Sequence, residues 1–176
     1  MEQEPPLESQ SAFKHMNFTP MTEAVAHQIV AWRYPPPYEI YNVSASQHTS
    51  VTRNLLDPKN RYECVYHDDL GLMGFACFGA DAQVPGGQYK KGAIDIGVGM
   101  RPALTGGGWG RDFVKAVRAQ ARVYFPKLPG RVTIAAFNKR AQLPWQGLGF
   151  VETMRFNRAS DGQTFVLFVE HVVKRI

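Results

Sequence analysis

A carboxylate and a run of glycines lie close together in the middle of the sequence. Asp95 falls in the segment IDIGVGMR at 94–101, and the segment TGGGWG at 105–110 follows, just before a strongly helical stretch. Glycines allow successive backbone N–H groups to point into one concavity, and a helix N-terminus adds about half a unit of positive charge. Such a turn binds pyrophosphate on backbone amides. The pattern therefore predicts a site for a phosphate-bearing cofactor beside a carboxylate.

The residues after the glycines exclude two other phosphate-binding motifs. A P-loop needs Gly-Lys-Ser or Gly-Lys-Thr, whereas Arg111 and Asp112 follow here. A dinucleotide-binding fold expects an acid about 20 residues further on, at the end of the next strand. The next predicted strand, 132–137, is followed by Asn138 instead. A glycine loop that is merely flexible is the remaining alternative to a cofactor turn.

Alternation along the predicted strand 94–101 separates two faces. Four apolar side chains share one of them: Ile94, Ile96, Val98 and Met100. Asp95, Gly97 and Gly99 share the other face, which has little side-chain bulk. Glycine inside a strand often marks the close approach of a ligand or of another backbone. We favour a ligand, with tight packing as the alternative, because the glycine turn follows directly.

A second segment, NKRAQLPWQGLGF at 138–150, has the pattern of a strand end, a short helix and a further strand. Together the two segments resemble the GNAT superfamily of N-acetyltransferases. The first family motif, an acid-bearing strand and a glycine turn at a helix start, is matched by Asp95, Pro102, Gly108 and Gly110, with Thr105 in its first position. The second family motif is matched by Asn138, Arg140, Ala141, Leu148, Gly149 and Phe150.

The resemblance implies a mixed α/β (α+β) domain with a GNAT-like splayed β-sheet flanked by helices. Acetyl-CoA would lie in the cleft between the strand of Asp95 and the strand that ends at Phe137. Backbone groups of Val98, Gly99 and Met100 would pair with its pantetheine arm as an added strand does. Its pyrophosphate would lie on the turn formed by Thr105, Gly106, Gly107, Gly108, Trp109 and Gly110. Asn138 would contact the pantetheine arm, and a simple helix N-cap is its alternative role.

Two residues depart from the family pattern. Thr105 replaces the usual Arg or Gln, which weakens the expected phosphate contact, although backbone amides suffice. Trp145 stands where the family often has a tyrosine that acts as general acid. An indole N–H is a hydrogen-bond donor only, so Trp145 can pack on the thioester or bond to its sulfur but cannot protonate a thiolate. Solvent, Tyr38 or Tyr41 would supply that proton, and Pro144 would kink or end the short helix.

The predicted reaction needs a base and an acceptor site. A protonated amine must lose a proton before it attacks a thioester, and Asp95 is the predicted base, directly or through water. Its alternatives are binding of a cationic acceptor and a structural role. The aromatic segment 32–41, with three consecutive prolines, is irregular; it is predicted to line the acceptor site, and packing over the sheet edge is its alternative. Its candidate substrate residues are Trp32, Tyr34, Tyr38 and Tyr41.

Hydrophobic periodicity predicts the element order β-α-α-β-β-β-α-β-α-β-β. Residues 1–11 are predicted to be disordered, and residues 12–176 to form one GNAT-like acyltransferase domain without a repeat or a linker. The most regular predicted helix covers 109–124, with an apolar stripe that runs to Tyr124. A second predicted helix covers 44–56, and the first strand covers 13–18.

The composition is that of one ordinary soluble domain: 176 residues, 44% hydrophobic and 20% charged. The net charge of +5 suits an anionic ligand or plain solubility. No apolar run approaches the roughly 20 residues of a membrane span, and the acidic start of the chain is unlike a signal peptide. Cys64 and Cys77 form no disulfide framework, which favours a cytoplasmic protein, and the histidines show no metal-ligand spacing.

We expect an acetyl-CoA-dependent N-acetyltransferase that acts on a small-molecule amine or a peptide, with no nucleic-acid or membrane partner. Pairing of the last two strands across a homodimer is left open. A catalytically inactive CoA-binding regulatory module is the alternative, favoured slightly by Thr105 and Trp145 and opposed by Asp95. A nucleic-acid- or partner-binding protein is a third hypothesis, and it would use the basic helix face of Arg111, Lys115, Arg118 and Arg122. A solvated helix face explains that pattern better.

Overall fold

The computed structural model describes residues 15–172. The predicted disorder of residues 1–11 and the start of the predicted first strand at Phe13 lie outside this range. The strands are β1 (Met16–Pro20), β2 (Tyr62–His67), β3 (Gly71–Phe78), β4 (Ile94–Met100), β5 (Gly130–Ala135), β6 (Phe150–Asn157) and β7 (Thr164–Glu170). The α-helices are α2 (Glu23–Ala31), α3 (His48–Leu56), α4 (Gly110–Tyr124) and α5 (Lys139–Gly147). This order of strands and helices agrees with the order predicted from periodicity.

The strands within residues 15–172 form one seven-stranded sheet in the order β1-β2-β3-β4-β5-β7-β6. Neighbouring strands are antiparallel except β4 and β5, which are parallel. The sheet is therefore mixed, as the family resemblance implied.

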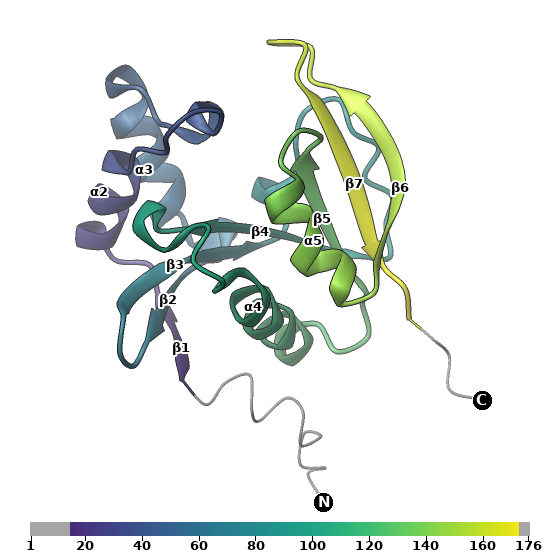
Figure 1. Cartoon of the computed structure of the whole chain (residues 1–176), viewed down its shortest axis with the longest axis horizontal. Helices are drawn as coiled ribbons and strands as arrows, with labels where there is room; N and C mark the ends of the chain where they lie inside the picture. The colour runs from purple at the N-terminus through teal and green to yellow at the C-terminus, as the bar shows by residue number, and fades with distance from the viewer. Residues whose placement is uncertain (1–14, 173–176) are drawn as a thin grey trace, which may run out of the picture.

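The sheet divides into two arms between β4 and β5. These strands pair only at Ile94 with Gly130 and at Asp95 with Arg131. Beyond that point β4 stays paired with β3 as far as Met100, and β5 stays paired with β7 as far as Ala135. Figure 1 shows β4 crossing the middle of the molecule while β5, β7 and β6 turn away from it. The implied splay of the sheet is present.

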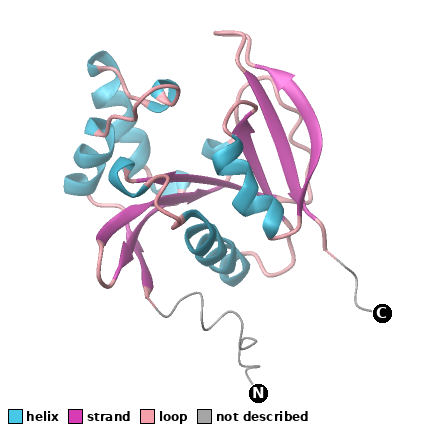
Figure 2. Cartoon of the chain, viewed as in Figure 1, coloured by secondary structure: helices cyan, strands magenta, loops and turns pink. Residues whose placement is uncertain are grey.

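Helices cover the sheet in two groups (Figure 2). In the main core α4 packs against the strands of the sheet. This core includes Phe113, Val117, Met73 and Ile96. A second core lies under α2 and α3, and it includes Val25, Ile29, Val30, Leu55 and Cys64. Each helix is thus held by its apolar face, which is how a helix of this length gains its stability.

Local signals explain where the helices begin. Thr22 caps α2, because its side chain accepts a hydrogen bond from the Val25 amide at 3.2 Å. The predicted helix 44–56 begins instead as the short 3-10 turn Ala45–Gln47 and continues as α3.

The apolar stripe predicted for α4 ends before Tyr124, because that residue is 44% exposed. None of the helices in residues 15–172 is long and apolar enough to cross a membrane.

Candidate active site

Asp95 is buried in an ion pair at the point where β4 and β5 diverge. Arg131 donates from Nε to Oδ1 at 2.6 Å and from Nη2 to Oδ2 at 2.8 Å. Gln83 donates a third hydrogen bond to Oδ2 at 2.9 Å. The exposed fractions of Asp95 and Arg131 are 6% and 5%. The hydrogen bonds from the guanidinium to this carboxylate raise the pKa of Arg131.

This geometry does not favour the predicted base role of Asp95. Both carboxylate oxygens already accept hydrogen bonds from side chains of this chain, and the residue is buried. Neither oxygen is therefore free to contact an acceptor amine. The arrangement fits the structural alternative, in which Asp95 joins the two arms of the sheet.

The two glycines beside Asp95 are covered by side chains of this chain. A β-carbon at Gly99 would clash with the Phe75 ring, and one at Gly97 would lie 2.7 Å from Cys77 Sγ. These positions lack room for any larger residue, because neighbours in β3 fill the space. The tight-packing alternative therefore accounts for this face, and a ligand is not needed to explain either glycine.

The open edge of β4 lies on the side of β5. Ile94 bonds toward that side, where its amide donates to the Pro129 carbonyl at 3.0 Å. The Arg101 amide bonds toward β3, at 2.9 Å from the Met73 carbonyl. Since neighbouring residues point their backbone groups to opposite edges, Val98 and Met100 face the diverging strand β5 and Gly99 faces β3. Of the three residues predicted to pair with pantetheine, Val98 and Met100 thus have the required direction.

The glycine turn leads into an uncapped helix. Gly106 and Gly108 have positive φ angles of 74° and 87°, which explains why glycine stands there. No side chain caps the start of α4 at Trp109, so the amides of its first turn are left for another acceptor. The Thr105 hydroxyl donates to the Pro102 carbonyl at 2.7 Å and thus holds the turn itself. This is the geometry of an anion site built on backbone amides.

Arg140 brings a positive charge to the same turn. A β-carbon at Gly106 would lie 3.3 Å from its Nη1. Its guanidinium also lies over the Tyr38 ring, 4.1 Å from the centroid. The sequence predicts Arg140 only as a residue of the second family motif, and the structure places its charge beside the turn, where Thr105 carries none.

Asn138 caps α5 and contacts the aromatic segment. Its Oδ1 accepts from the Ala141 amide at 3.1 Å, which is the N-cap role given above as the alternative to a pantetheine contact. Its Nδ2 donates to Tyr41 Oη at 3.0 Å. The side chain therefore joins the end of β5 to the loop that carries Tyr41.

Trp145 is part of the main core. Its side chain is 1% exposed and packs edge to face on Phe150, with ring centroids 4.9 Å apart. Its burial gives no support to a direct contact with cofactor. Pro144 was predicted to kink or end the short helix; the helix does not end there but continues to Gly147. Gly110 leaves room for the proline ring, whose Cγ would lie 3.3 Å from a β-carbon there.

The aromatic segment connects the ends of β4 and β5. Tyr34 donates from Oη to the Met100 carbonyl at 2.7 Å. Tyr38 and Tyr41 pack on Phe137, with ring centroids 5.9 and 6.4 Å away. Trp32 lies elsewhere, stacked on Phe75 at 6.1 Å beside the second core. Packing thus explains Trp32, whereas the three tyrosines gather where the arms of the sheet separate.

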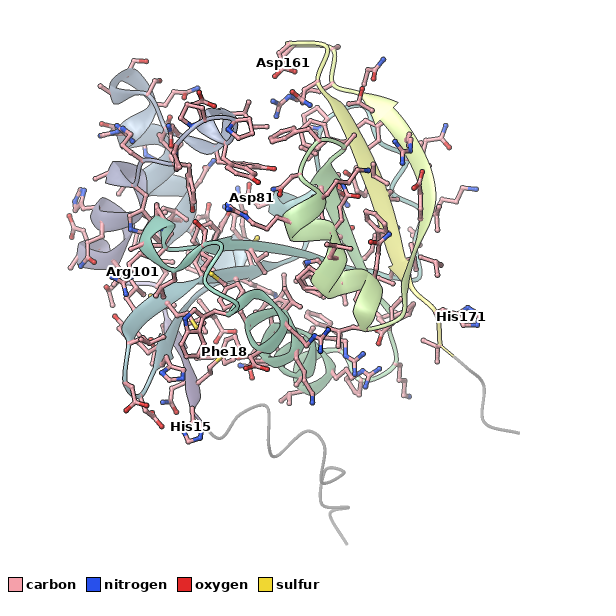
Figure 3. The ribbon with its side chains drawn as sticks, in the orientation of Figure 1. His15, Phe18, Asp81, Arg101, Asp161 and His171 are labelled. Carbon is pink, nitrogen blue, oxygen red and sulfur yellow. The ribbon has the colours of Figure 1, made fainter. Side chains whose placement is uncertain are left out.

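Two polar residues of this region escaped the sequence reasoning. Arg131 pairs with Asp95 across 36 positions, and Gln83 reaches the same carboxylate from the loop after β3. The same loop carries Asp81, which Figure 3 labels near the middle of the molecule. Nothing in the local sequence of Arg131 marks it as a partner of Asp95, because only the strand register brings the two together.

Comparison with known proteins identifies the fold. No model of a known protein family and no curated protein sequence matches this chain. A chimera of the Vibrio cholerae spermidine N-acetyltransferase SpeG and hSSAT aligns over 89% of this chain and 95% of its own, with a TM-score of 0.60 and 14% identity. A Bacillus anthracis acetyltransferase of the GNAT family aligns over 88% of this chain and 93% of its own, with a TM-score of 0.65 and 11% identity.

An intermediate-state structure of the dodecameric Vibrio cholerae spermidine N-acetyltransferase aligns over 89% of this chain and 93% of its own, with a TM-score of 0.59 and 14% identity. At these identities the likeness shows the fold. The chain has the fold of the GNAT N-acetyltransferases, which confirms the fold predicted from the two motifs.

Proposed function

We propose that this protein transfers an acetyl group from acetyl-CoA to a primary amine of a small molecule or a peptide. One observation carries the proposal: the open edge of β4 ends beside a glycine turn and the uncapped N-terminus of α4. An extended arm with amide groups fits a strand edge, and a pyrophosphate fits the helix N-terminus. Coenzyme A carries both groups in one molecule.

The residues present fit this cofactor. Val98 and Met100 would pair with the pantetheine arm, and the amides of Gly106–Gly110 would hold the pyrophosphate. Arg140 would add the charge that Thr105 lacks. When bound, acetyl-CoA supplies an activated acyl group. The Val98 N–H would polarise the acyl carbonyl, as a backbone donor in an oxyanion hole does.

Asp95 has a positioning role in this proposal. With Arg131 it holds β4 to β5 at the point where the two strands diverge. We assign the loss of the amine proton to solvent, because the Asp95 carboxylate is already engaged by three donors. The side chains of Tyr34, Tyr38 and Tyr41 would line the acceptor site, where aromatic faces hold an ammonium group.

The acceptor and the assembly are the finer points of the proposal. The SpeG structures are of a spermidine N-acetyltransferase, so spermidine is a rational first acceptor to test. One of them is dodecameric, which makes assembly of this chain with copies of itself a reasonable expectation. The edge strand β6 is the surface for such pairing. Two free, buried cysteines suit the cytoplasm.

The test is a turnover assay with a panel of amines. Acetyl-CoA is mixed with spermidine, an aromatic monoamine or a peptide with a free N-terminus, and release of the CoA thiol is followed. Thiol release that depends on one of these amines, with an acetylated product seen by mass spectrometry, supports the proposal. Release that is no faster than with heat-inactivated protein, for every amine, contradicts it.

The inactive CoA-binding module is the second candidate, and the burial of Trp145 is the observation that favours it. The usual tyrosine of the family is missing, and its replacement is enclosed in the core. This candidate predicts that CoA binds but that no amine in the panel accelerates thiol release.

A further inference from the structure

We propose that Tyr41 is a catalytic residue that protonates the leaving sulfur in the acetyl transfer. The inference rests on the proposed function, and it names the group that does what Trp145 cannot do. Trp145 has no acidic proton and is buried in the core. A hydroxyl must therefore come from another element of the fold, and Tyr41 places one against Asn138.

The proton and the electrons balance in one step. The amine nitrogen bonds to the acyl carbon and gives up a proton to solvent. The bond between carbon and sulfur breaks, and its electron pair goes to sulfur. Tyr41 Oη gives its proton to that sulfur, and the resulting phenolate takes a proton back from water. No other reagent is needed.

The hydrogen bond with Asn138 leaves the proton of Tyr41 free to be donated. Asn138 Oδ1 accepts from the Ala141 amide, so its other atom must be the NH₂ group. That group can only donate, so Tyr41 Oη accepts the bond of 3.0 Å. Within residues 15–172 the Tyr41 hydroxyl makes no other hydrogen bond, and its own proton is not committed. A general acid needs this arrangement, in which the hydroxyl is held in place and its proton is free to be donated.

The other two tyrosines of the segment do not meet this requirement. The Tyr34 hydroxyl already donates its hydrogen bond to the Met100 carbonyl at 2.7 Å. Burial raises the pKa of Tyr34, so it stays protonated and bonded there. Tyr38 lies with its ring under the Arg140 guanidinium, and its hydroxyl has no hydrogen bond that would orient it within the described residues. Of these three tyrosines, Tyr41 is the one whose hydroxyl is both oriented and able to donate.

Tyr41 also lies between the two arms of the sheet. Its ring meets Tyr34 edge on, with centroids 6.1 Å apart, and Tyr34 is bonded to the end of β4. On its other side it packs on Phe137 and bonds to Asn138, at the end of β5. The proposed cofactor site runs along the β4 edge between these ends. Tyr41 is 38% exposed, so part of the residue is open to a bound molecule.

Two neighbours of Tyr41 favour the phenolate that forms, against the effect of burial. Burial raises the pKa of Tyr41, and the negative charge of an ionised Tyr38 would raise it further. The hydrogen bond from Asn138 and the positive charge of Arg158 lower it. Arg158 lies near the β6–β7 hairpin and pairs with Asp161, which Figure 3 labels at the hairpin tip. These groups would hold the negative charge until water returns the proton.

The test measures the pKa of the CoA thiol in the bound state, and it needs no acceptor. Thiolate absorbance in the far ultraviolet is followed as the pH of the CoA complex is raised, with the desulfo-CoA complex subtracted. The proteins are the wild type, Tyr41→Phe and the control Tyr124→Phe, which removes a hydroxyl on α4 that bonds to Glu63. Protein with 3-fluorotyrosine at position 41 is a second probe, since it keeps the hydroxyl and makes it a stronger donor.

A donor on sulfur stabilises the thiolate. The thiol pKa of bound CoA should therefore rise by about one unit or more in Tyr41→Phe and stay unchanged in Tyr124→Phe. The fluorinated protein should show a lower thiol pKa than the wild type. The same thiol pKa in every complex overturns the role of Tyr41 but not the cofactor site. Failure of CoA to bind the wild type overturns the proposed function as well.

Discussion

Asp95 and Arg131 face each other in the last residue pair that joins β4 to β5, and their side chains form a bidentate ion pair. Both residues are buried, and both belong to the strands whose divergence opens the proposed cofactor site. The carboxylate that the sequence predicts as a catalytic base is therefore engaged in a buried ion pair that joins the two strands. Loss of the Asp95 carboxylate should therefore lower the free energy of unfolding.

Asp95→Asn should lower the free energy of unfolding by about 3–5 kcal/mol, because it leaves the buried Arg131 guanidinium without its counter-charge. The double variant Asp95→Leu/Arg131→Met, which replaces both charges with apolar groups, should recover much of that loss. Urea unfolding at neutral pH measures both. An Asp95→Asn protein with wild-type stability and no turnover would instead support the base role.

Gly108→Ala should destabilise the fold by about 1–2 kcal/mol, because φ at this position is 87° and a β-carbon is strained there. No atom lies within 4 Å of the added carbon, so the effect is one of backbone conformation alone. Gly147→Ala is the matched control: its helical position is equally open, and alanine should stabilise it by about 0.4–1 kcal/mol. Equal melting temperatures for the two variants would contradict this reading of the turn.

Arg140→Gln should weaken CoA binding by about tenfold, because one charge-assisted hydrogen bond to phosphate is lost. Arg155→Gln removes a similar exposed charge from β6, where Arg155 pairs with Glu152, and should leave the affinity for CoA unchanged. Titration calorimetry with CoA at low and high salt measures both. If the two variants bind CoA equally well, Arg140 has no part in the phosphate site.

Stability should fall in alkaline solution because of Cys77. Burial raises the pKa of its thiol from 9.0 to about 12. Between these values the unfolded chain has lost the proton that the folded chain keeps, so rising pH favours unfolding. The free energy of unfolding should decline progressively from about pH 9 to about pH 12.

Cys77→Ala removes this titration and should flatten the decline relative to the wild type. Burial raises the pKa of Tyr62 as well, so part of the alkaline loss should persist in the variant. Urea unfolding at several pH values above 8 makes the comparison. Parallel curves for the two proteins would mean that Cys77 does not carry the effect.

The fold was largely predictable because its signals are local. The stripe of Phe113 and Val117 predicts α4, and the glycine turn before it predicts where the helix begins. The order of the elements followed from such periodicities. The two motifs then indicated the splayed sheet through the family resemblance.

The meaning of single residues was less predictable, because it depends on partners far along the chain. Gly97 and Gly99 are small because Cys77 and Phe75 in β3 cover them. Trp145 matches a catalytic position in the motif, but its side chain packs on Phe150 in the core. No local pattern shows that Asn138 bonds to Tyr41, since 97 positions separate them.

The most direct measurement of the central claim is a thermal melt of the protein with acetyl-CoA, CoA, ATP or NAD. A ligand present at a hundred times its Kd should stabilise the fold by about 2.7 kcal/mol. We predict a clear rise in melting temperature with acetyl-CoA and with CoA, and none with ATP or NAD. No shift with either CoA compound, at concentrations up to the millimolar range, would contradict the cofactor site on which the account rests.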